Sequence, residues 1–139
     1  MPYRKAWLQP QIGSQGFFGT QKVYGGRIPI LAADVATTGN VVGLFMLPAN
    51  FLIFDWISPN LPALGTALVV NIGDAGSANR YASGITTLAA GGVPLAAMAA
   101  TGPFFKTTQD TEIQMTVTTQ ASAPAAGTLE MYIRGFIYA

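Results

Sequence analysis

Six carboxylates are the groups in this sequence best suited to acid–base chemistry, because histidine and cysteine are both absent. That absence excludes Ser-His-Asp and Cys-His catalysis, and the zinc and haem sites that depend on these residues. A glycosidase would need two carboxylates about 5–10 Å apart in a cleft. The six are scattered along the chain: Asp34, Asp55, Asp74, Asp110, Glu112 and Glu130.

Asp110 and Glu112 are the carboxylates closest together in the sequence, and an extended chain places both on one face near the start of a strand. Charges there would also keep the edge of a sheet soluble and unpaired. This simpler role explains the pair. The sequence therefore predicts no catalytic residue, no cofactor and no enzymatic activity.

The polar stretch 73–80, GDAGSANR, could bind a cation or form a turn. Asp74, Ser77 and Asn79 offer oxygen atoms, but calcium takes six to eight, and an EF-hand loop has more acids and a terminal Glu. In the alternative, the Asp74 side chain closes a turn and pairs with Arg80. The stretch offers fewer oxygen ligands than calcium requires, so we favour the turn and predict no metal site.

This polar stretch lies between two segments that are typical of strands. Residues 67–72 form an apolar run rich in β-branched side chains, and 79–85 restart an extended segment. Further strands are predicted at 21–31, 41–47, 51–57, 104–107, 112–119 and 128–138. About eight strands without an amphipathic helix predict an all-β fold, a two-sheet β-sandwich resembling a jelly roll.

Side-chain alternation gives the expected core of this sandwich: Val70, Ile72, Ile113, Met115, Val117, Leu129, Met131 and Ile133. Three of the predicted segments have local features that depart from a simple strand. Gly25 and Gly26 are expected to break 21–31, and Pro29 indicates an edge strand or a bulge. Strict alternation in 51–57 leaves both faces apolar, which predicts a strand covered on two sides, as in a central strand or at a subunit contact. The Ala- and Gly-rich segment 88–102 fits either a helical turn or a thin strand.

The composition favours a subunit of an assembly. Charged residues make up 9% of the 139 residues, against a usual value of about 25%, and the net charge is +1. A membrane span is disfavoured because Pro, Gly and Asp break every long apolar run. No cluster of Lys and Arg indicates nucleic-acid binding, and no signal peptide is expected at the N-terminus. Surface hidden against neighbouring subunits explains the low charge.

Residues 1–20 carry four large aromatic side chains among Gly, Gln and Pro, without a helix or strand period. They predict an extended N-terminal arm, followed by a single β-sandwich domain over 21–139. Such an arm is expected to lie on its own sandwich or on a neighbouring subunit. The candidate contact residues are Tyr3, Arg4, Lys5, Trp7, Phe17 and Phe18 in the arm, and Tyr132, Phe136 and Tyr138 on one strand face.

Four segments resemble the small structural proteins of tailed-bacteriophage virions: LPANFLIFDWIS (47–58), ALVVNIGDAGSANRYASGIT (67–86), TTQDTEIQMTVTT (107–119) and GTLEMYIRGFIYA (127–139). The shared order is a strand ending at Gly73-Asp74, a restart at Arg80-Tyr81, and a strand entered through Asp110-Thr111 before a C-terminal strand. The resemblance implies a cement or decoration protein, β-rich and multimeric, that binds the major capsid protein. A homo-oligomer is expected, a trimer on the exterior of the virion, made in the host cytoplasm.

Two alternative functions stay open at this point. One is a tail or neck structural protein of the same kind of virion. The other is a carbohydrate-binding β-sandwich, in which Tyr132, Phe136 and Tyr138 would stack on sugars.

Overall fold

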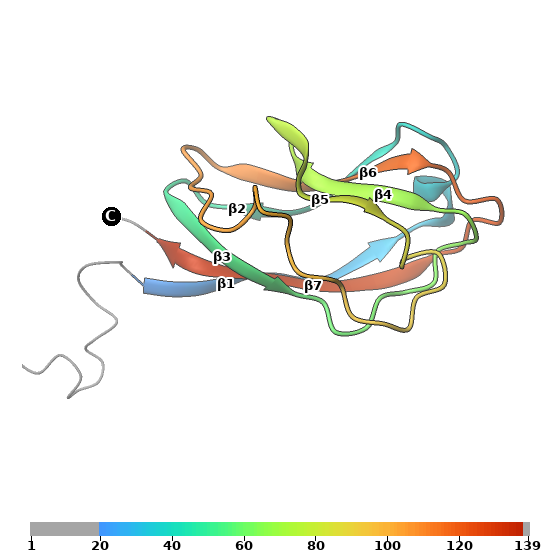
Figure 1. Ribbon diagram of the computed structural model, residues 1–139, viewed down its shortest axis with the longest axis horizontal. Helices are drawn as coiled ribbons and strands as arrows, with labels where there is room; N and C mark the ends of the chain where they lie inside the picture. The colour runs from blue at the N-terminus through green and yellow to red at the C-terminus, as the bar shows by residue number, and fades with distance from the viewer. Residues whose placement is uncertain (1–19, 138–139) are drawn as a thin grey trace, which may run out of the picture.

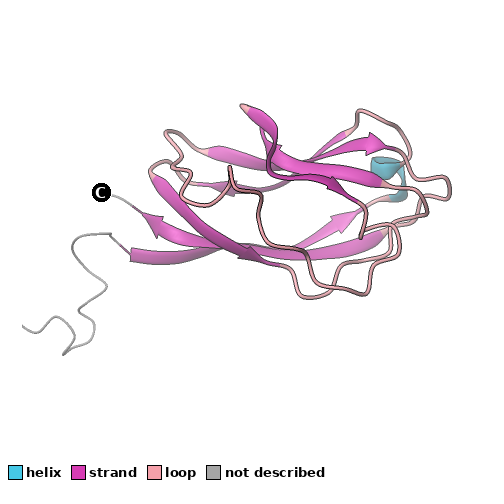
Figure 2. Cartoon of the chain, viewed as in Figure 1, coloured by secondary structure: helices cyan, strands magenta, loops and turns pink. Residues whose placement is uncertain are grey.

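The structure, a computed structural model, describes residues 20–137. Seven strands and one short 3-10 helix account for its regular structure (Figures 1 and 2). In chain order these are β1 (Thr20–Ile30), η2 (Ala32–Val35), β2 (Val41–Leu47), β3 (Phe51–Ile57), β4 (Val69–Asp74), β5 (Ser77–Ile85), β6 (Thr111–Thr119) and β7 (Gly127–Ile137).

The strands form two antiparallel sheets that face each other across the core (Figure 1). One sheet has the order β1-β7-β3, and the other has the order β2-β6-β4-β5. The predicted all-β, two-sheet sandwich is confirmed. The short link from β2 to β3 joins the two sheets, because its strands belong to different layers.

The strand order is that of a jelly roll in which one strand is much shorter than the others. A jelly roll pairs its first strand with its last, and continues inward until the middle two strands form a hairpin. The pairs β1–β7, β2–β6 and β4–β5 follow this scheme. The remaining partner of β3 is segment 104–107, which the sequence predicts as a strand. It forms one bridge, Leu52 to Lys106, and backbone hydrogen bonds such as Ile53 N–H to the Phe105 carbonyl at 2.9 Å.

Strand β1 is continuous, so the predicted break at Gly25 and Gly26 is wrong. Its ladder with β7 runs without a register shift from Thr20 to Ile30. Gly25 has a φ of 133°, and a Cβ there would collide with the Met131 carbonyl oxygen. Glycine is therefore required because the backbones of β1 and β7 approach each other closely at this position, and not because the chain turns there. The edge position predicted from Pro29 is confirmed, since β1 ends the three-stranded sheet.

Strand β3 departs from the strict alternation that its sequence predicts. A bulge shifts its register with β7 between Ile53 and Asp55. After the bulge Trp56 points into the core, with 7% of its surface exposed, whereas Ile57 points outward with 49% exposed. One extra residue reverses which side chains face the core.

The segments around β4 and β5 differ from the predicted ones in detail. Strand β4 begins two residues later than predicted, because Ala67 adopts a φ of 71°, a left-handed conformation that is uncommon for a residue with a Cβ and lies outside the extended region. The Ala- and Gly-rich segment 88–102 is neither helix nor strand. It is held by backbone hydrogen bonds, including Leu64 N–H to the Leu88 carbonyl and Leu95 N–H to the Ser58 carbonyl, both at 2.8 Å.

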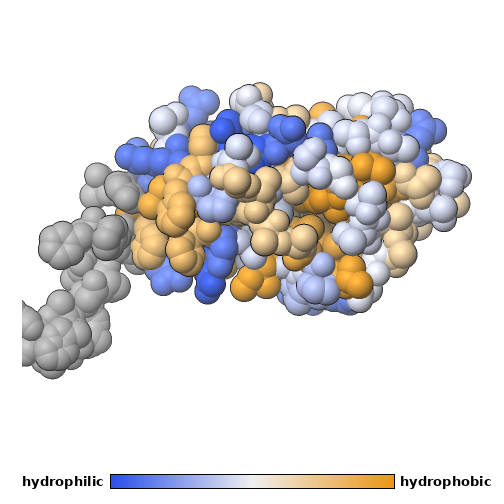
Figure 3. Space-filling view, in the orientation of Figure 1, coloured by the Kyte–Doolittle hydropathy of each residue, from blue (hydrophilic) through white to orange (hydrophobic). Residues whose placement is uncertain are grey.

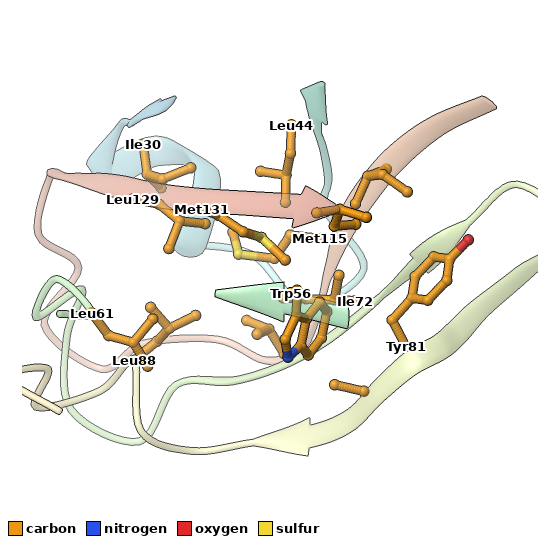
Figure 4. Packing of buried hydrophobic residues seen from close by; sticks show 14 of the residues in the cluster. Ile30, Leu44, Trp56, Leu61, Ile72, Tyr81, Leu88, Met115, Leu129 and Met131 are labelled. Carbon is orange, nitrogen blue, oxygen red and sulfur yellow. The ribbon is translucent and has the colours of Figure 1, made fainter. Parts of the chain in front are cut away.

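The core lies between the sheets, and Figure 4 shows side chains from both layers meeting there. All eight residues that the alternation assigns to the core are at most 1% exposed. Tyr81 and Leu88 are buried to a similar degree, so β5 and the irregular segment also contribute to the core. The prediction of the core is confirmed.

Candidate interaction surface

The loop that could have bound a cation is a tight turn closed by Asp74. The carboxylate of Asp74 accepts hydrogen bonds from the backbone N–H groups of Gly76 and Ser77, each at 3.0 Å. It also accepts bonds from Arg80 Nε at 2.7 Å and from the Tyr81 hydroxyl at 3.0 Å. Asp74 is 4% exposed, and its oxygens are occupied by donors within the chain. The predicted turn and its Asp74–Arg80 pair are confirmed.

The electrostatics of this turn favour a charged Asp74. Burial by itself would raise the pKa of the carboxyl. The hydrogen bonds from Arg80, Ser77 and Tyr81, with the Arg80 charge, outweigh burial and hold this pKa below its usual range. Burial and the neighbouring carboxylate raise the pKa of Tyr81, so its hydroxyl stays protonated and donates. The turn is therefore a structural clamp, and it offers no free acid or base.

Because this carboxyl has a lowered pKa in the folded state, the clamp should lose its contribution to stability in acid. An Asp in the unfolded chain has a pKa of about 3.9. The contribution of the ionised Asp74 to stability is complete above this unfolded-state pKa, and it falls as the pH drops through the lower, folded-state pKa. The free energy of unfolding, measured with urea from pH 6 to pH 2, should decline less steeply in Asp74→Asn than in the wild type. Equal slopes for the two proteins would contradict the prediction.

The other predicted carboxylate pair, Asp110 and Glu112, does not protect a sheet edge. Strand β6 lies between β2 and β4, so the edge explanation is wrong. Asp110 accepts the Ala49 N–H at 3.1 Å, and Glu112 accepts a bond from Gln114 at 3.0 Å. Within residues 20–137, no three Asp, Glu, His or Cys side chains gather closely enough to hold a metal ion.

An apolar surface lies on the outer face of the β1-β7-β3 sheet. Three of its residues are strongly exposed, Val23 by 58%, Phe54 by 46% and Ile57 by 49%, and so is Phe104, by 66%, in the segment that lies beside β3. Figure 3 shows apolar surface gathered over the start of β3. We call this surface the outer-face patch and define it by Val23, Phe54, Ile57, Phe104, Tyr132, Arg134 and Phe136.

Aromatic rings form one half of the outer-face patch, and a hollow forms the other. The ring centre of Phe54 lies 6.0 Å from that of Phe104 and 6.5 Å from that of Phe136, in edge-to-face arrangements. The hollow has a volume of about 240 Å³, and each strand of the sheet contributes to its wall. The lining residues are Val23, Ile57, Tyr132 and Arg134.

The polar groups within the patch bond to groups of the same chain. Arg134 Nη2 lies 2.7 Å from an oxygen of Asp55, and the Arg134 guanidinium stands 5.9 Å from the Phe54 ring centre. The Tyr132 hydroxyl donates to Glu130 at 2.7 Å, and this hydrogen bond raises the pKa of Tyr132. Because these charges are matched locally, the patch presents mainly apolar area to a partner.

The structure places two of the predicted contact residues, Tyr132 and Phe136, on this common face of β7. Tyr138 and the six arm residues Tyr3, Arg4, Lys5, Trp7, Phe17 and Phe18 lie outside the described residues.

Sequence reasoning missed Val23, Phe54, Ile57 and Phe104. The apolar character of both faces of 51–57 was the available signal. The inner face of 51–57 is buried, and within residues 20–137 the outer face carries exposed Phe54 and Ile57, so cover of this face at a subunit contact stays a prediction.

Comparison of the sequence with protein-family models and with curated proteins finds no match. Comparison of the fold with solved structures does find similar chains. A chain of the cyanophage Pam1 capsid asymmetric unit matches with a TM-score of 0.74 and 26% identity, over 99% of this chain and 100% of that chain. A chain of the Ralstonia phage GP4 capsid matches with a TM-score of 0.68 and 16% identity, over 89% and 88%. At that identity the second similarity shows the fold alone.

The described residues contain no helix that is long and apolar enough to span a bilayer. The similarity to the Pam1 capsid chain supports a structural role associated with a phage capsid, and a location in the virion. The predicted resemblance to virion proteins is thus confirmed. The structural neighbours of this chain are phage capsid-associated chains.

Proposed function

We propose that this protein is a capsid cement or decoration protein, which binds the major capsid protein on the exterior of a phage head and stabilises the shell. The observation that carries the proposal is the outer-face patch, in a chain that resembles capsid chains in fold. Aromatic residues and Arg are enriched at protein interfaces, and the patch consists largely of these types. Its partner surface would be apolar at the centre and polar at the rim.

The N-terminal arm is the second element of this proposal. Ordering its backbone costs about 1–2 kcal/mol per residue, and burying one aromatic side chain returns about 1.5–3 kcal/mol. Four aromatic residues therefore offset only part of ordering residues 1–20. Contacts with a neighbouring subunit or the shell would supply the rest, with Arg4 and Lys5 available to carboxylates there. We further propose that the protein is a homo-oligomer, a trimer, and that residues 21–139 form its single folded domain.

Deletion of residues 1–19, which ends just before β1, should leave the sandwich folded and weaken its attachment to the particle. The measurements are thermal melting of the isolated protein, and occupancy on capsids that lack the endogenous copy. We expect a nearly unchanged melting temperature and a loss of occupancy of tenfold or more, since each lost aromatic contact of 1.4 kcal/mol weakens binding about tenfold. Unfolding of the truncated chain, with attachment per folded molecule unchanged, would contradict the proposal.

Position on the particle separates this function from the alternatives. An image of the native virion with density for the protein only at the tail or neck would favour that role. A carbohydrate-binding role needs polar groups beside the rings, but Asp55 pairs with Arg134 and Tyr132 bonds to Glu130. Retention on an immobilised sugar without capsid binding would favour it nonetheless.

A further inference from the structure

The exposed ring of Phe104 lies on a backbone turn that is unfavourable for a residue with a large side chain. We propose that Phe104 is the anchor of the outer-face patch, the side chain that inserts into an apolar pocket of the major capsid protein. This inference rests on the proposed function. It deepens that function, because it assigns the largest single contribution to binding to one residue and states the shape and chemistry of the partner surface.

Residues 102–105 form a type II β-turn with phenylalanine at the position that normally takes glycine. Phe105 N–H donates to the Gly102 carbonyl at 3.1 Å, which closes the turn, and Pro103 occupies its second position. The third position of a type II turn requires a positive φ, and Phe104 has a φ of 66°. A bulky residue rarely adopts this conformation, because it brings the Cβ too close to the backbone.

The stability of the domain does not explain why a ring occupies this position. Asn50 and Ala67 are the other non-glycine residues with a positive φ within residues 20–137, and asparagine tolerates this region while alanine is small. Phe104 is bulky, and burial does not compensate for the strain, because it is 66% exposed, the highest value among the exposed large apolar residues of the described chain. Strain at an exposed residue is a feature of functional sites.

The surrounding contacts hold the turn, and with it the Phe104 ring, in one place. Phe104 N–H donates to the Ile53 carbonyl at 2.7 Å, and Ile53 N–H donates to the Phe105 carbonyl at 2.9 Å. The Arg80 guanidinium lies 3.8 Å from the centre of the Phe105 ring. The Phe54 ring contacts Phe104 edge to face, with ring centres 6.0 Å apart. A side chain that is positioned in advance loses little freedom on binding, which favours a dominant role at an interface.

The Phe104 side chain also indicates what kind of surface receives it. A phenyl ring has no hydrogen-bonding atom, so it fits an apolar pocket, and a cavity of about 150 Å³ holds a benzene ring. Around it, the Arg134 charge of the patch is matched by Asp55. Because the ring is uncharged, moderate salt should leave this contact largely intact.

Binding of full-length chains to capsids that lack the endogenous copy tests the proposal. Phe104→Ala removes the ring but keeps a Cβ at the strained position, whereas Phe104→Gly removes both. Each should raise the apparent Kd for capsids about tenfold or more, and tenfold corresponds to about 1.4 kcal/mol. Ile57→Ala, within the patch, should weaken binding less. Met46→Ala, at a residue of the other sheet that is 53% exposed, should leave binding unchanged.

Thermal melting of the same variants tests the strain separately. Phe104→Gly should melt a few degrees higher than Phe104→Ala, because glycine adopts a positive φ without strain and alanine does not. If Phe104→Gly does not fold, Phe104→Asn replaces it, since asparagine is also accepted at this position of the turn. A glycine or asparagine variant that melts below the alanine variant would contradict the strained turn and overturn the proposal.

The outcomes distinguish this inference from the proposed function. If wild type binds capsids, and either Phe104 variant binds equally well or Ile57→Ala loses as much affinity, the inference fails and the function stands. If wild type does not bind capsids, the function fails and the inference fails with it. Sedimentation velocity without capsids should give one oligomeric state for wild type and Phe104→Gly. A smaller species for the variant would assign the ring to a contact between copies of this chain, and would overturn the proposal.

Discussion

Val117→Asp should leave the full-length chain unfolded at neutral pH. Val117 is 1% exposed and points from β6 into the space between the two sheets. The penalty for an unpaired charge at such a site is several kcal/mol, and the lost apolar burial adds about 1.5–3 kcal/mol. Together these are comparable to the whole stability of a small domain, about 5–15 kcal/mol. Loss of the β-type circular dichroism spectrum and red-shifted emission from Trp56, which is buried in the native core, should report the unfolding.

The matched control for this substitution is Thr118→Asp, one residue further along the same strand. Thr118 is exposed, and its hydroxyl donates a hydrogen bond of 3.1 Å to the Val69 carbonyl. Losing this bond should cost about 1 kcal/mol, which leaves the protein folded. If both variants fold, Val117 does not lie in the core. If both variants unfold, β6 does not tolerate an aspartate for a reason other than burial of the side chain.

Asp74→Ala should lower the free energy of unfolding by about 3 kcal/mol, at the lower end of the range for breaking a buried ion pair. The substitution leaves Arg80, with 20% of its side chain exposed, without its partner. It also leaves the hydroxyl of the fully buried Tyr81 without an acceptor. The backbone N–H groups of Gly76 and Ser77 lose their hydrogen bonds to the same side chain. Chemical denaturation at pH 7 measures the difference.

The control here is Asp55→Ala, which removes a second Asp–Arg pair of similar geometry in an exposed position. The side chains of Asp55 and Arg134 are 38% and 40% exposed, and exposed pairs contribute about 0–1 kcal/mol. Asp55→Ala should therefore cost less than about 1 kcal/mol. Equal losses in the two variants would mean that burial does not distinguish the pairs, and that the Asp74 clamp has been misjudged.

Local sequence determined much of this fold because side-chain alternation in a strand is a local property. Residues 112–119 and 128–137 alternate cleanly, and the six apolar residues that the alternation assigns to their inner faces lie in the core, as predicted. The turn at Asp74 was also predictable, since its carboxylate bonds to residues two to seven positions away. The absence of histidine and cysteine limits the possible chemistry of this chain in any fold, because no arrangement of strands can supply a missing side chain.

Tertiary structure alone decided the features that depend on which strands lie side by side. The bulge in β3 exists in relation to its partner β7, and it moves Trp56 into the core and Ile57 to the surface. Segment 104–107 has the composition of a strand, but in the fold it forms only one bridge, to the edge of β3. The outer-face patch joins residues from β1, β3 and β7, which lie far apart in the chain. Alternation shows that a strand has two faces, but only the packing of the second sheet decides which face is covered.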